Sequence, residues 1–191
     1  MKSPVVYKEL TGILGPRFKS LGFQKIGSSR PKWVKQYNGD SLHVYLSTHK
    51  HPWEPYAGCS FIVEVYVCPS DTPVRHIESD HNNSESYFGE DLKQLEEIQE
   101  IGLRVLSKVK KIDLANISKN NAAYPDLEFL KLLHQSSIES MESDLSLSGL
   151  KAWFDPWLFY LELEDVTAWS EFISSKLEQN IARIEQSRKI A

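Results

Sequence analysis

The dipeptide Asn38-Gly39 constrains the fold of this chain more strongly than any other part of its sequence. It lies between two runs, 32–37 and 42–48, that contain the β-branched and aromatic residues typical of strands. Asparagine and glycine best tolerate the positive φ angles that a two-residue hairpin turn requires. The sequence therefore predicts an antiparallel hairpin here, and an antiparallel sheet around it.

Three further segments are predicted to be strands of the same sheet. In 59–68, alternate residues from Phe61 to Val67 form one apolar face, and the opposite face is only partly polar, as expected for a central strand. The segments 23–26 and 157–161 are shorter candidates, the second because Asp155-Pro156 interrupts an apolar stretch. Together with the hairpin they predict an antiparallel sheet of about four or five strands.

Helices are predicted before, within and after this sheet, which makes the fold class α+β. Apolar residues recur at spacings of three and four in four segments, about 5–21, 90–110, 125–141 and 165–187. Pro16 predicts a bend in the first helix, because proline lacks a backbone donor and clashes with the preceding turn. Six serines lie between Ser136 and Ser148 and predict a linker after the third helix.

Two stretches between these elements are predicted to lie on the surface. The stretch 71–89 contains two histidines, several serines and asparagines, and little apolar periodicity. The loop 49–58 has two prolines, aromatic residues and a terminal glycine. It joins two core strands, so its base is held while its tip can face solvent. We therefore expect function first in this loop.

Length and charge narrow the classes of function. A chain of 191 residues with 41% hydrophobic content has the size of one domain, so residues 1–191 are predicted to form a single α+β domain. Asp and Glu total 26 against 22 Lys and Arg, and this excess argues against nucleic acid as the main partner. The longest apolar run is Trp157 to Leu161, and residues 1–8 lack the apolar core of a signal peptide, so neither a membrane partner nor export is expected.

The two cysteines indicate the compartment. Cys59 and Cys68 lie on one predicted strand and point to opposite faces, separated by roughly 30 Å at about 3.3 Å per residue. A disulfide needs Cα atoms within about 7 Å, so both are expected to be free, at least half-buried thiols in a reducing compartment. The predicted location is the cytoplasm.

Few patterns in the sequence predict catalysis. There is no glycine-flanked serine elbow, phosphate-binding glycine loop, His-Glu-x-x-His motif or dinucleotide fingerprint. The most metal-like set consists of His49, His51, His76, Asp80 and His81. Imidazole and carboxylate groups together bind zinc or iron, but this spacing is not diagnostic, and polar loops commonly contain histidine.

Carboxylates also concentrate before the last predicted helix. Glu162, Glu164 and Asp165 lie between Trp157 and Trp169. Paired carboxylates beside aromatic rings suit glycoside hydrolysis. The stronger expectation is that Asp165 caps the helix, since its charge would meet unpaired backbone amides and the positive end of the helix dipole.

Three groups of residues resemble a known family. They are Leu21-Gly22-Phe23-Gln24-Lys25, the strand-loop-strand Val44–Val67, and Pro156-Trp157-Leu158-Phe159-Tyr160 followed by Glu164-Asp165-Val166-Thr167-Ala168-Trp169. Together they look like the bacterial domain of unknown function 4304 family over about the first seventy and last forty residues, whereas the middle helices have no counterpart. The resemblance implies an α+β fold with a curved antiparallel sheet. Related small cytoplasmic domains resemble immunity proteins that neutralise toxins of competing bacteria, and the family offers no catalytic residues.

These observations favour a non-catalytic, cytoplasmic protein-binding domain without a cofactor, and its most specific form is an immunity-type inhibitor of a bacterial toxin. The predicted contact residues are Trp53, Glu54, Tyr56 and Trp157. Aromatic side chains anchor interfaces, and the two prolines of the loop limit the entropy lost on docking. Packing of these aromatics over the core is the competing interpretation.

The alternative function is a metal-dependent hydrolase or another enzyme. It would use the loops that carry His49, His51, His76 and His81. Such an enzyme requires these histidines to converge in one cavity.

Overall fold

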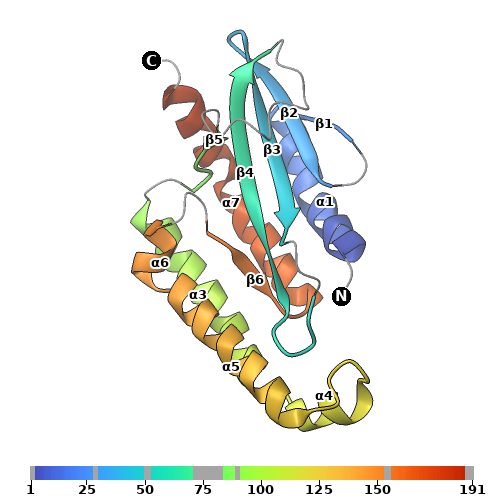
Figure 1. Cartoon of the computed structure of the whole chain (residues 1–191). Coiled ribbons are helices and arrows are strands. Elements are labelled where there is room, and N and C mark those ends of the chain that lie inside the picture. Colours follow the sequence, from blue (N-terminus) through green and yellow to red (C-terminus); the bar gives the residue numbers. More distant parts are fainter. Residues whose placement is uncertain are drawn as a thin grey trace.

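The computed structural model describes residues 3–27, 30–49, 53–70, 84–88, 91–152 and 156–187. Within these ranges the chain forms six helices and one curved, six-stranded antiparallel sheet, so the predicted α+β class is confirmed (Figure 1). The strands are β1 (Gln24–Lys25), β2 (Lys32–Tyr37), β3 (Asp40–Thr48), β4 (Cys59–Pro69), β5 (Ser84–Glu85) and β6 (Leu158–Tyr160). The helices are α1 (Ser3–Ser20), α3 (Leu92–Val109), α4 (Leu114–Asn120), α5 (Leu127–Asp144), α6 (Leu147–Ala152) and α7 (Leu163–Ser187).

The predicted hairpin joins β2 to β3. Asn38 has φ 49° and Gly39 has φ 88°, and Tyr37 pairs with Asp40 directly across the turn. Two successive positive φ angles are those of the two-residue hairpin turn that Asn-Gly favours. The prediction from this dipeptide is confirmed.

The long strand β4 is the centre of the sheet. Along one edge it pairs with β3 from Asp40↔Pro69 to Thr48↔Phe61. Along the other edge it pairs with β5 near Val65 and with β6 near Cys59. The predicted C-terminal strand is therefore β6, and it lies beside the first residues of β4.

The main core lies between one face of this sheet and the helices α1 and α7 (Figure 1). Alternate residues of β4 from Phe61 to Val67 point into it, as their spacing predicted. Helix α1 continues through Pro16, and its predicted apolar stripe contributes Val6, Leu10, Leu14 and Phe18. The stripe of α7 contributes Val166, Trp169, Ile173, Leu177, Ile181 and Ile184.

A second layer of helices packs beside the sheet. Helices α3 and α5 lie along each other, with α4 and α6 at the two ends of this pair (Figure 1). They share a smaller apolar cluster formed by Val105, Leu106, Val109, Ile138, Met141 and Leu145. Phe159 and Leu161 pack against this cluster, so the segment of β6 connects the helical layer with the sheet.

The serine-rich linker predicted after the third helix is wrong. Helix α5 continues to Asp144, and α6 begins soon afterwards at Leu147. Serine is only mildly unfavourable in a helix. The buried stripe of Leu130, His134, Ile138 and Met141 continues through the serine-rich part and outweighs that cost.

The prediction of a surface excursion over 71–89 is wrong at its end. Strand β5 lies there, and Tyr87 and Phe88 are buried in the main core. The Tyr87 hydroxyl donates to the carbonyl oxygen of Ile173, 3.2 Å away in α7. The rest of this prediction, residues 71–83 and 89, lies outside the described residues.

In the described part of the chain, no helix has the length and apolar character needed to span a membrane.

Candidate functional site

A cavity of about 380 Å³ lies where the two layers meet. Three parts of the chain form its walls: residues 54–60, the middle of α5 and residues 157–159. Glu54, Ser136, Ser140 and Asp144 contribute polar groups, and Tyr56, Trp157 and Phe159 contribute aromatic rings. Cavities of this size hold small ligands or single side chains of a partner.

The loop before β4 is held in a tight turn at this cavity. The backbone amides of Glu54 and Gly58 each donate to the other residue's carbonyl oxygen, at 2.9 and 2.7 Å. Gly58 has φ +75°, and a Cβ atom at this position would lie 2.3 Å from the carbonyl oxygen of Tyr160. Only glycine fits here, so the loop lies directly against β6.

Helix α5 and the segment before it hold the other side of the loop. The Nδ1 atom of His134 lies 2.7 Å from the carbonyl oxygen of Tyr56, which can only accept, so Nδ1 carries the hydrogen. The Tyr124 hydroxyl donates to the Glu54 carboxylate. The Tyr56 and Tyr124 rings pack edge to face with centroids 5.3 Å apart. The loop is therefore fixed before any partner arrives.

The charge of Glu54 affects both tyrosines. Burial and the hydrogen bond to Glu54 raise the pKa of Tyr124 to about 12, so its hydroxyl stays protonated and donates at neutral pH. Burial and the nearby Glu54 charge also raise the pKa of Tyr56. Among the described residues, no lysine, arginine or histidine forms an ion pair with Glu54.

The remaining wall combines aromatic and sulfur groups. The ring of Trp157 packs edge to face on His49, with centroids 5.0 Å apart. The thiol of Cys59, which forms no disulfide, also borders the cavity, whereas Cys68 is fully buried nearer the other end of β4. Three of the four predicted contact residues, Glu54, Tyr56 and Trp157, therefore line one cavity.

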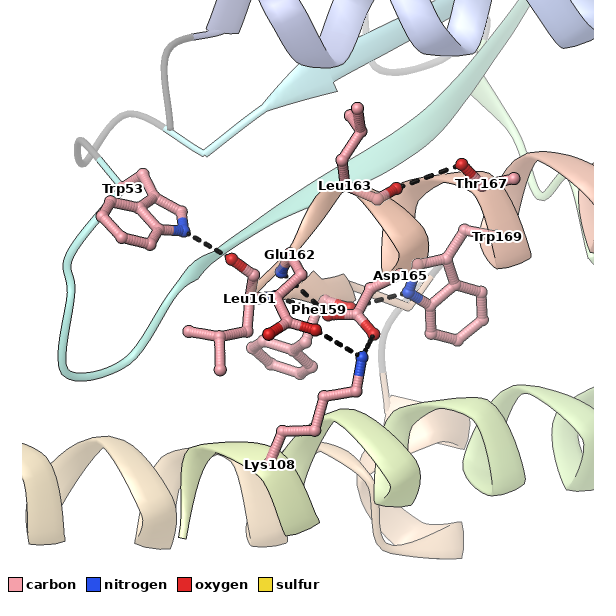
Figure 2. A network of polar contacts seen from close by, with 9 residues as sticks. All are labelled: Trp53, Lys108, Phe159, Leu161, Glu162, Leu163, Asp165, Thr167 and Trp169. Carbon is pink, nitrogen blue, oxygen red and sulfur yellow. Dashed lines mark hydrogen bonds and ion pairs between the residues drawn. The ribbon is translucent and has the colours of Figure 1, made fainter. Parts of the chain in front are cut away.

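Trp53 has a different position. Its ring packs against the main core, and its indole N–H donates to the carbonyl oxygen of Leu161, 3.0 Å away (Figure 2). Trp53 is not among the described residues that line the cavity. In this position it supports the base of the loop.

The carboxylates of Glu162 and Asp165, at the turn between β6 and α7, form a separate network (Figure 2). Asp165 is the third residue of α7, and its carboxylate accepts the backbone amides of Leu161 and Glu162, both at 2.9 Å. The prediction that Asp165 is the capping residue is therefore wrong, because α7 begins two residues earlier, at Leu163, and Asp165 reaches back from the first turn to the amides that precede the helix. Lys108 of α3 reaches Asp165 at 2.6 Å and Glu162 at 3.0 Å. Its hydrogen bond to Asp165 raises the pKa of Lys108.

This network joins the two layers. The indole N–H of Trp169 donates to the carbonyl oxygen of Phe159 at 2.7 Å, from the same helix that carries Asp165 (Figure 2). Lys108 extends from α3, in the helical layer, to the Asp165 carboxylate (Figure 2). Two of the three carboxylates considered for glycoside hydrolysis, Glu162 and Asp165, are thus engaged in fixing the turn between β6 and α7.

The histidines of the alternative function fall mostly outside the described residues. His49 borders the cavity, whereas His51, His76, Asp80 and His81 are not described. Within the described ranges, no group of three or more His, Cys, Asp or Glu side chains is placed to hold a metal ion.

Sequence reasoning missed the wall formed by α5. Ser136, Ser140 and Asp144 line the cavity, but they fell in or beside the predicted linker. The apolar spacing from Leu130 to Met141 carries the signal that would have found them, because it continues the helix and puts these polar residues on one side.

Comparisons of the chain with protein-family models, with curated proteins and with solved structures find no match. Membership of the bacterial domain of unknown function 4304 family stays a prediction from short motifs. What the cavity can bind follows from its own side chains.

Proposed function

We propose that this chain is a non-catalytic protein-binding domain and that it holds part of its partner in the cavity between residues 54–60 and α5. The observation that carries the proposal is that Glu54, Tyr56 and Trp157 line this one cavity. Interface hot spots are typically aromatic or charged side chains around a pocket from which water is excluded.

The fixed shape of the loop supports binding. Its turn is closed by two backbone hydrogen bonds, and His134 and Tyr124 hold it from the side of α5. A site that is already ordered loses little conformational entropy when a partner docks. More of the contact energy is then expressed as affinity.

The hydroxyl group of Ser137 in the cavity wall is not arranged for nucleophilic attack. Ser137 donates its hydroxyl hydrogen to the carbonyl oxygen of Leu133, 2.9 Å away in the same helix. A serine nucleophile needs a neighbouring base to take this proton. This arrangement favours a structural role for Ser137 in the wall.

The most specific form of the proposal is an immunity-type inhibitor of a bacterial toxin. The resemblance to small immunity-like domains supports it, as does the net charge of −4. An acidic inhibitor is attracted to a cationic surface on its partner, and this attraction speeds association.

The proposal is tested by affinity capture with the tagged full chain from cells in which it is naturally made. Trp157→Ala and Tyr56→Ala each remove one aromatic wall and are expected to weaken partner binding by about 2 kcal/mol, roughly 30-fold in Kd. Leu103→Ala is the matched control, since Leu103 is an exposed apolar residue of α3 with no place in the cavity.

Thermal melting of each variant establishes that it is folded. A specific partner that is captured by the wild type and the control, but lost from both cavity variants, supports the proposal. Folded cavity variants that capture the partner as well as the wild type would contradict it.

A further inference from the structure

We propose that the cavity receives a guanidinium group, carried by an arginine side chain of the partner. This inference rests on the proposed function and specifies its chemistry. It follows from the charge of the cavity, from the position of Glu54 and from the aromatic walls.

The charge of the lining favours a cation. Glu54 contributes a carboxylate from the loop. None of the described residues that line the cavity is a lysine or an arginine. A carboxylate in a partly enclosed site attracts a cation.

Glu54 is positioned but not neutralised. One of its carboxylate oxygens accepts the Tyr124 hydroxyl, which fixes the direction of the group. No described cationic side chain pairs with it. A partly buried carboxylate gains most from a cation that also brings hydrogen-bond donors.

The walls favour guanidinium over ammonium. Tyr56, Trp157 and Phe159 provide aromatic surface, and the planar guanidinium group stacks on such rings. Its five N–H donors can serve several acceptors at once, such as Glu54 and the hydroxyl of Ser140. An ammonium group is more strongly hydrated and makes a point contact, so it uses this arrangement less well.

The size of the cavity suits one side chain. Its volume of about 380 Å³ is near the lower end for ligand sites, which run from roughly 300 to 1,000 Å³. An arginine side chain could enter while the backbone of the partner stays outside. The neighbouring rigid loop would then contact that backbone.

The test uses the full chain and isothermal titration calorimetry at low salt. The probes are the tripeptide acetyl-Gly-Arg-Gly-amide, the same tripeptide with neutral citrulline in place of arginine, and free agmatine. We expect the arginine tripeptide to bind at least tenfold more tightly than the citrulline tripeptide. Equal affinity for these two, or no binding of the arginine tripeptide at millimolar concentration, would overturn the inference.

Two variants connect this selectivity to Glu54. Glu54→Gln keeps an acceptor for Tyr124 but removes the charge, and it is expected to abolish the preference for arginine over citrulline. Glu171→Gln is the control, because it changes the net charge equally at an exposed position of α7 outside the cavity. If Glu54→Gln keeps the full preference, or if Glu171→Gln loses it too, the inference is wrong.

The remaining outcomes separate the two proposals. Agmatine binding at least tenfold more tightly than the arginine tripeptide would overturn the assignment to a partner side chain in favour of a free small molecule. If partner capture needs Trp157 and Tyr56 while arginine and citrulline bind alike, the proposed function stands and the guanidinium inference fails. If arginine is selected but partner capture does not depend on the cavity, the proposed function fails, and with it the assignment to a protein partner.

Discussion

Asp165 is a buried carboxylate that holds the turn between β6 and α7. It is 6% exposed, accepts two backbone amides and pairs with Lys108. Sequence reasoning expected Asp165 to accept backbone amides as the cap of α7, whereas it lies inside the first turn and reaches back to the amides before the helix. Sequence reasoning could not anticipate Lys108, because that contact joins residues far apart in the sequence through the packing of α3.

Replacing Asp165 by alanine should lower the free energy of unfolding by about 2–3 kcal/mol, because two amides and the ammonium group of Lys108 lose their acceptor. Glu162→Gln is the control, since Glu162 pairs with the same lysine at an exposed position and should cost less than about 1 kcal/mol. Urea denaturation measures both. Equal losses in the two variants would contradict this account of the turn.

His43 is a second residue whose environment has a measurable consequence. It is 4% exposed, with Nε2 lying 2.9 Å from the hydroxyl oxygen of Ser41. Nδ1 has no hydrogen-bond partner in the described part of the chain. Burial, together with the positive charge of Lys32, lowers the pKa of His43 below its ordinary value of 6.5. The folded state therefore holds this ring in its neutral form.

The sign of the pH dependence follows from this shift. Above pH 6.5 the ring is neutral in both states, whereas below it the unfolded chain takes up a proton that the folded chain resists. The contribution of His43 to stability is thus present above pH 6.5 and lost as the pH falls further. We expect His43→Gln to lose less stability between pH 7 and pH 5 than the wild type. An equal fall of the urea midpoint from pH 7 to pH 5 in the variant and the wild type would count against this prediction.

Among the elements, the hairpin β2–β3 was predictable because its determinants are local. Gly39→Val forces a branched side chain to φ +88° and should cost about 1–3 kcal/mol. Gly12→Ala is the counterpart in α1, where an added Cβ meets nothing within 4 Å, and should stabilise the chain by up to about 1 kcal/mol. Thermal or urea unfolding distinguishes the two. An unchanged midpoint for Gly39→Val would refute the role assigned to the turn.

Elements whose formation depends on distant contacts were predicted less well. Helix α5 runs through serines that alone suggest a linker, because its buried face packs on α3. Tyr87 and Phe88 follow a polar stretch, yet α7 and the main core bury them. Neither contact is visible in the neighbouring sequence. Local patterns were sufficient for five of the six strands, whereas tertiary packing decided β5 and the middle helices.

In the whole molecule, the candidate site lies at the junction of the sheet layer with the α3–α5 layer (Figure 1). Glu54, Tyr56 and Trp157 were chosen from the sequence because aromatic and charged residues near strand ends suit recognition. Their convergence requires the pairing of β6 with β4 and the position of α5. The sequence therefore identified one side of the site, and the fold supplies the other.

Site-specific photo-crosslinking tests the central claim, that the partner binds at this junction, most directly. A photo-reactive phenylalanine analogue is placed either at Ser136, on the cavity wall of α5, or at Glu171, exposed on α7 and outside the cavity. The full chain is then irradiated with its captured partner. The account predicts a covalent adduct from position 136 and none from position 171. An adduct from position 171, with none from position 136, would contradict it.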